Sequence, residues 1–314
     1  MIRRPAALAS GLALLFLPLA AAVSLGSTGP GWGEGGALAM LRAPRALAAA
    51  AAGLALGVGG ALQQGVFRNP LADPGLTGVF GGALLGAAAL LGFAPETAWE
   101  RAWHLPAAGF AGALGATAVL SLFGSGGGPA RLLLAGLGVN AFTAAATLII
   151  AALRPGARET IANGAYGDWL GTASPETVWL PGLICVAASA TSLMLARGLD
   201  RASLGDDVAT TLGCDPRALR RRAALFTALA AGAATCLVGQ IAFLGLIAPH
   251  LARTLGGPGH RGLIPLSGLI GAVLLVAADT AGRSLPLGSS LPAAAIMAAV
   301  GAPAFLWIAR RNHG

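Results

Sequence analysis

Charged side chains are scarce in this sequence, and their scarcity decides the class of protein. Only 10% of the 314 residues are charged, whereas a soluble domain carries about 25%. Mean hydropathy is +0.75, and many windows hold the roughly 20 apolar residues that cross the hydrocarbon core of a bilayer. Open sheets leave backbone groups unpaired in lipid, and these runs lack the alternation of barrel strands. The sequence therefore predicts an all-α membrane protein, a single polytopic bundle of about ten helices over residues 1–314.

Lysine is absent, and cysteine and histidine are few. All 20 basic residues are arginine, scattered between apolar segments without interleaved aromatic residues, which argues against a nucleic-acid partner despite the net charge of +8. The three cysteines and four histidines show no metal-ligand or disulfide spacing, so we expect no metal site. No GxxxxGK[ST] nucleotide loop occurs, and we predict neither catalytic residues nor a bound cofactor for this chain.

Apolar runs separated by proline, glycine and charge clusters predict the individual spans. They lie near 6–25, 46–66, 75–93, 105–123, 132–153, 177–196, 223–239, 241–256, 262–281 and 291–309. The first run could also be a cleaved signal peptide, but its length and the spans after it favour an uncleaved helix. With both termini cytoplasmic, fourteen of the 20 arginines fall inside and six outside, as the positive-inside rule requires.

The stretch FRNPLADPG at 67–75 lies between two glycine-rich apolar runs. Proline lacks an N–H and disfavours helix in the residue before it, so Asn69-Pro70 should end a helix. Asp73 can then cap the next helix, with Pro74 at its first position. We therefore predict a short, rigid elbow at the inner face. A weak echo, again with Gln and Phe before a proline, occurs in VGQIAFLGLIAPHL and would suit an inverted repeat beside a translocation path.

The stretch LDRASLGDDVATTLG at 199–213 is amphipathic and is broken at Gly205. We expect two short helices, with two aspartates in the first turn of the second, where the helix dipole favours acids. Leu204, Val208 and Leu212 are spaced four apart and predict an apolar ridge that suits a groove on a partner. A solvated loop is the alternative.

Asp279 is the one acidic residue inside a predicted span. A carboxylate at membrane depth is costly and points to function. Arg283 follows four residues later, in the favourable order of acid before base, so we expect an ion pair that orients the arginine. A proton-coupled role is the less favoured alternative.

Four stretches carry a family resemblance: RNPLADPG, LARGLDRASLGDDVATTLGCDPRALRRR, GLIAPHLAR and VGAPAFLW. In this order and spacing they resemble the FecCD-type permease subunits of ABC importers for iron–siderophore complexes, haem and vitamin B12, across nearly the whole chain. Two positions depart from the family pattern. GVFGGA, with Phe80 and Gly81, replaces a GVSSGA-like run, and Ser290 stands where the family often has Glu. We expect these changes to line the pathway or to pack against it, and so to bear on the substrate.

The resemblance implies a type II ABC importer permease fold and a subunit that pairs with a second copy of itself. It implies two ATPase subunits on the cytoplasmic face, a periplasmic substrate-binding protein and membrane lipid as further partners. It assigns an inner gate to Asn69, Pro70, Leu71, Gly128, Pro129 and Ala130, ATPase coupling to Leu199, Leu204, Gly205, Asp206, Asp207, Val208, Leu212 and Gly213, and binding-protein docking to Arg42, Arg45 and Arg283. Anchoring to lipid headgroups is the alternative for these three arginines.

Two other classes of function stay open. A secondary transporter would need charged or polar residues deep in several spans, and apart from Asp279 the spans carry almost none. An intramembrane enzyme would need a Ser/His or His/Asp cluster, whereas His250 stands alone beside Pro249. For an importer, the expected cargo is an iron chelate, with haem and siderophore about equal and cobalamin behind.

Overall fold

The computed structural model describes residues 19–24, 37–94, 103–124, 129–165, 169–285 and 291–311. Within these ranges every regular element is a helix, which confirms the all-α fold class. The α-helices are α2 Ala37–Phe67, α3 Val79–Phe93, α4 His104–Gly124, α5 Pro129–Leu153, α6 Arg158–Ala165, α7 Pro175–Ser192, α8 Ala196–Ala202, α9 Asp206–Thr211, α10 Pro216–Val238, α11 Leu244–Gly256, α12 His260–Ser284 and α13 Ala293–Arg311. Short 3₁₀ turns are η2 Pro74–Thr77, η4 Pro155–Ala157, η5 Trp169–Thr172 and η6 Leu193–Leu195.

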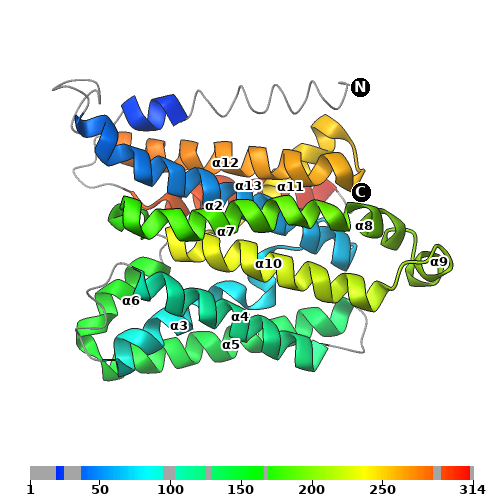
Figure 1. Cartoon of the computed structure of the whole chain (residues 1–314), viewed down its shortest axis with the longest axis horizontal. Helices are drawn as coiled ribbons and strands as arrows, with labels where there is room; N and C mark the ends of the chain where they lie inside the picture. The colour runs from blue at the N-terminus through cyan, green and yellow to red at the C-terminus, as the bar shows by residue number, and fades with distance from the viewer. Residues whose placement is uncertain are drawn as a thin grey trace.

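The helices form two groups that α10 joins. Helix α2 lies in the first group and packs against α7, α10, α11 and α12 (Figure 1). In the second group α3 packs against α4 and α5, and α10 contacts α3 and α4. Helices α8 and α9 project at one end of the bundle, and α6 lies at the opposite end (Figure 1). These two ends are the two faces that a bilayer would separate.

The seams between helices are built from small residues. A Cβ on Gly53 or Gly57 of α2 would overlap the backbone of α12, and one on Gly82 or Gly86 of α3 would overlap that of α4. In lipid no hydrophobic force drives helices together, so close backbone approach and van der Waals contact hold them. The four-residue glycine stripes in the sequence therefore mark tight packing.

Among the described residues, six helical segments are long and apolar enough to cross a membrane: α2, α4, α5, α10, α12 and the run from α7 to α8 at Pro175–Ala202. Helices α3 and α13 are shorter apolar helices. Helix α11 has only 13 residues, about 20 Å, because residues 239–243 are not helical, so the segment predicted to span at 241–256 is shorter than a full crossing. Most of the predicted first span lies outside the described residues.

Candidate functional site

The elbow after α2 is held closed by its own side chains. The backbone N–H of Leu71 donates to Oδ1 of Asn69 at 2.9 Å, and that of Gly75 donates to Oδ1 of Asp73 at 2.8 Å. Asp73 is thus the cap, with Pro74 at the first position, as predicted. The element that starts there is the four-residue turn η2, because Gly78, with φ 82°, interrupts the helix before α3 begins at Val79.

The tip of the elbow folds back along α2. A Cβ on Gly59 would lie 3.3 Å from Cγ of Pro74. Gly59 precedes the end of α2 by eight residues, about 12 Å along the helix axis. From α5, Asn140 donates through Nδ2 to the carbonyl of Gly75 at 2.7 Å. The sequence placed the elbow at the inner face. In the structure its start lies at the helix end, while its tip reaches into the bundle because Gly59 leaves room beside α2.

The segment that echoes the elbow in the sequence lies directly against it. Gln64 of α2 donates through Nε2 to the carbonyl of Gly245 at 3.3 Å, and Phe243 precedes the first residue of α11. In the described part of the chain, Arg68 (φ 49°) and Phe243 (φ 64°) are the two residues other than glycine with positive φ. This conformation costs about 1–2 kcal/mol for a residue with a Cβ, and such strain gathers at functional sites.

A pocket of about 820 Å³ lies between the elbow, the start of α11 and α13. Its lining combines amide and carboxyl groups with aromatic rings: Asn69, Asp73, Gln240, Phe80, Phe243 and Phe305. The rings of Phe243 and Phe305 lie 6.1 Å apart between centroids. The volume falls within the range of about 300–1,000 Å³ typical of small-molecule sites. A mainly apolar wall with a few polar groups suits a bulky, partly polar ligand.

Two of the three predicted inner-gate residues of the elbow, Asn69 and Leu71, line this pocket. Pro70 is exposed beside them. For the second gate segment, Gly128 lies outside the described residues, Pro129 begins α5, and the side chains of Pro129 and Ala130 are not described. Of the departures from the family pattern, Phe80 contributes to the pocket wall and Ser290 lies outside the described residues.

The predicted coupling loop folds into the two short helices expected, α8 and α9. Gly205, with φ 112°, separates them, Asp206 and Asp207 occupy the first turn of α9, and Gly213 follows with φ 74°. The apolar ridge is exposed: Leu204, Val208 and Leu212 are 62%, 43% and 49% exposed. Three leucine or valine side chains on one exposed face are unfavourable in water, so this face suits a protein partner.

Leu199 was predicted as part of this contact surface, but it is 0% exposed and packs in the core with residues of α2, α10 and α12. It anchors α8 because the apolar side chain faces the bundle. The next residue strengthens the anchor: Oδ1 of Asp200 accepts from the backbone N–H of His260 at 2.9 Å and lies 2.7 Å from its Nδ1. The loop is thus fixed to α12 at its root and exposed at its tip.

Asp206 ties the tip of the loop to two other elements. Its Oδ1 pairs with Arg68, at the end of α2, and its Oδ2 with Arg220 of α10. The Arg220 guanidinium, together with that of Arg68, lowers the pKa of Asp206 below its ordinary value, so the carboxylate stays charged at neutral pH.

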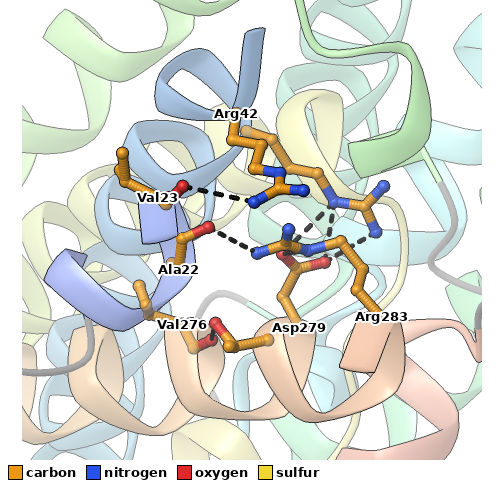
Figure 2. Close-up of polar contacts among 8 residues, drawn as sticks. Ala22, Val23, Arg42, Val276, Asp279 and Arg283 are labelled. Atoms are coloured by element: carbon orange, nitrogen blue, oxygen red, sulfur yellow. Dashed lines mark hydrogen bonds and ion pairs between the residues drawn. The ribbon is translucent and has the colours of Figure 1, made fainter. Parts of the chain in front are cut away.

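At the opposite end of the bundle, Asp279 is the centre of an arginine cluster (Figure 2). Arg45 donates to Oδ1 of Asp279 through Nε at 2.9 Å and through Nη2 at 2.7 Å, and Arg283 donates through Nε to Oδ2 at 3.0 Å. Arg283 also donates to the carbonyl of Ala22 at 3.1 Å, and Arg42 to that of Ser24 at 3.3 Å. The Asp279–Arg283 pair is confirmed.

The cluster differs from the sequence-based expectation in how its arginines point. Arg42, Arg45 and Arg283 were assigned to binding-protein docking, which needs exposed side chains, but those of Arg45 and Arg283 are only 17% and 10% exposed, and that of Asp279 is 1% exposed. The physical reason is the desolvated carboxylate, which needs charge-assisted donors and obtains them from both α2 and α12. The outward charge of the cluster is therefore reduced.

Sequence reasoning missed Arg68, Arg45's bond to Asp279, and the rings of Phe243 and Phe305. The stretch VGQIAFLGLIAPHL did indicate that Phe243 could be part of the site, since it repeats the Gln and Phe that precede a proline at the elbow. Arg45 and Asp279 are 234 residues apart, and no local pattern joins them.

Comparison with known proteins identifies the family of this chain. Residues 33–311 match the FecCD transport family. The chain is 41% identical to the ferric enterobactin transport system permease protein FepD of Escherichia coli, over 86% of this chain and 81% of that one. It is 36% identical to the hemin transport system permease protein HmuU of Yersinia pestis, over 87% and 83%.

A solved structure gives the same result for the fold. An inward-facing conformation of a metal-chelate type ABC transporter superposes with a TM-score of 0.88 at 25% identity, covering 98% of this chain and 99% of that one. Both the matched residues and the shared fold extend over nearly the full length, and the chain belongs to the FecCD transport family.

Proposed function

We propose that this chain is the membrane-spanning subunit of an ATP-driven importer that carries an iron chelate, a ferric siderophore or haem, across the inner membrane. The observation that carries the proposal is the pocket of about 820 Å³ between the elbow, α11 and α13, in a chain of the FecCD transport family. Relatives named for ferric enterobactin and for hemin support an iron chelate as the cargo class.

The proposed mechanism is alternating access driven from outside the chain. A second copy pairs with this one around the path, and two ATPase subunits bind the exposed ridge of α9, where Leu204 and Leu212 project. A substrate-binding protein delivers cargo at the opposite end, near Arg42 and Asp279. The chain itself binds no nucleotide. ATP binding draws the two α9 helices together, and the helices that line the pocket then open to the other side.

The proposed topology puts α8, α9 and the end of α13 on the cytoplasmic side. Arginines are concentrated at that end, with Arg217, Arg220, Arg221 and Arg222 at the start of α10. Helix α13 ends on the same side as α8 (Figure 1), which supports a cytoplasmic C-terminus. If the non-helical residues 239–243 and α11 together make one crossing, the even number of crossings in the sequence-based topology puts the N-terminus inside as well.

Uptake into vesicles tests this function. The chain is reconstituted with its ATPase and binding protein, and uptake of radiolabelled ferric siderophore or haem is followed with and without ATP inside, with unlabelled siderophore, haem or cobalamin as competitors. We expect ATP-dependent uptake of one labelled iron chelate, and we expect that unlabelled cobalamin does not reduce this uptake. Uptake that follows a proton or sodium gradient without ATP would show a secondary transporter instead. The ion pairs of Asp279 with two arginines argue against that outcome, since both of its carboxylate oxygens already bind guanidinium groups of this chain.

A further inference from the structure

The residue that directly follows α2 is unsuited to its backbone conformation. Arg68 has φ 49°, and the N–H of the next residue, Asn69, donates to the carbonyl of Gln64 at 3.2 Å. This is the pattern of a helix C-terminus that closes through a left-handed residue, a position that glycine fills without strain. An arginine there accepts a conformational cost that its side chain must offset.

The side chain of Arg68 contacts α9, the second helix of the predicted coupling loop. Its Nη2 pairs with Oδ1 of Asp206, in the first turn of α9, while Oδ2 of the same carboxylate pairs with Arg220. The side chains of Arg68 and Asp206 are 34% and 43% exposed, and exposed pairs of this kind add little to stability. A stability role therefore does not account for an arginine in this conformation.

The chain after Arg68 is stiff and leads directly to the pocket. Asn69 is the next residue, and its Oδ1 accepts from the backbone N–H of Leu71 at 2.9 Å. The carbonyl of Asn69 accepts from the N–H of Ala72 at 3.1 Å. Asn69, Leu71 and Asp73 all line the pocket. Because these hydrogen bonds make the segment stiff, a displacement of the Arg68 guanidinium should also displace the residues of the pocket wall.

We propose that Arg68 is a positioning residue: its ion pair with Asp206 transmits the movement of α9 to the elbow and so couples the ATPase to the inner opening. The inference rests on the proposed function, because it needs an ATPase that moves α9. Asp200 fixes the root of α8 to α12, and in this proposal the ATPase moves α9 relative to that root while Arg68 follows the tip of α9. Arg220 joins Asp206 to α10, which does not enter the elbow, and so serves a different contact.

The test compares Arg68→Asn with Arg220→Gln in the complete importer. Asparagine tolerates the left-handed conformation, so Arg68→Asn removes the ion pair without adding strain. Arg220→Gln removes the other partner of the same carboxylate. The measured quantities are chelate transported and ATP hydrolysed in the same vesicles, together with the melting temperature of each purified complex. We expect Arg68→Asn to assemble and hydrolyse ATP, to melt no lower than wild type, and to lower the ratio of chelate to ATP at least tenfold.

Arg220→Gln should leave that ratio within about twofold of wild type, and Arg68→Lys, which keeps the charge, should restore most of what Arg68→Asn loses. An unchanged ratio in Arg68→Asn overturns the inference, and so does an equal fall in both variants, since that would show a general role of Asp206 in holding α9. Failure of the proposed function is separate: there the wild-type complex itself would show no ATP-dependent transport.

Discussion

At the scale of single residues, Asp279 is a buried carboxylate whose charge must be balanced inside the bundle. It is 1% exposed and is held by Arg45 and Arg283. Replacing it with asparagine leaves two mostly buried guanidinium groups without a counter-charge, which typically costs about 3–5 kcal/mol. Asp279→Asn should therefore lower the melting temperature in detergent strongly. Asp207→Asn, at an exposed position of α9, is the matched control and should shift it little, because surface substitutions stay within about 0.5 kcal/mol. Equal melting of both variants would show that the cluster does not stabilise the fold.

The same cluster changes how docking of a binding protein must be tested. Glutamate at Arg45 or Arg283 would face Asp279 and unfold the outer ends of α2 and α12, so loss of binding would not report on docking. Arg42 is the better position, because its side chain donates to the carbonyl of Ser24, and replacing it leaves the pairs of Asp279 with Arg45 and Arg283 in place.

At the scale of elements, substitutions in the segment of α8 and α9 can distinguish residues that contact the ATPase from residues that stabilise the fold. Leu204→Asp with Leu212→Asp puts charge on the exposed ridge and should abolish co-purification of the ATPase while the permease keeps its melting temperature. Leu199→Ala is the contrast: it truncates a fully buried side chain and should cost about 2–5 kcal/mol of stability. An ATPase that still co-purifies after both ridge substitutions would disprove the placement of the contact.

The elements also show how far sequence reasoning reaches. The helical class, the break at Gly205, the cap at Asp73 and the Asp279–Arg283 pair were predictable because each depends on residues within a few positions of one another. The return of the elbow along α2, the bond of Arg45 to Asp279 and the burial of Leu199 were not, since each depends on which helices become neighbours. The pocket belongs to this second kind, as its wall comes from the elbow, α11 and α13.

At the scale of the whole molecule, the elbow should approach its equivalent in a second copy when the path closes. In a Cys214→Ser background, which leaves only the buried Cys185 and Cys236, Leu71→Cys should cross-link two subunits in one nucleotide state and release in another. Met194→Cys, 81% exposed beside α7, is the control and should not cross-link. If Leu71→Cys cross-links to the same extent in every nucleotide state, the elbow is a static turn and does not move during transport.

Glycines pack α2 closely against α12 and α3 closely against α4. At these contacts, substitutions that enlarge a side chain are expected to be far more harmful than substitutions that shorten one. Residues such as Gly53 and Gly82 are already the smallest possible, and alanine is the commonest buried hydrophobic residue, 29 of 61 in the described chain, so truncation at these seams removes little and opens few cavities. Almost every substitution there enlarges a side chain against a neighbouring backbone, which overpacks the seam and forces whole helices apart. Harmful changes in the core will therefore alter helix spacing, and with it the width of the pocket, before they alter the helices themselves.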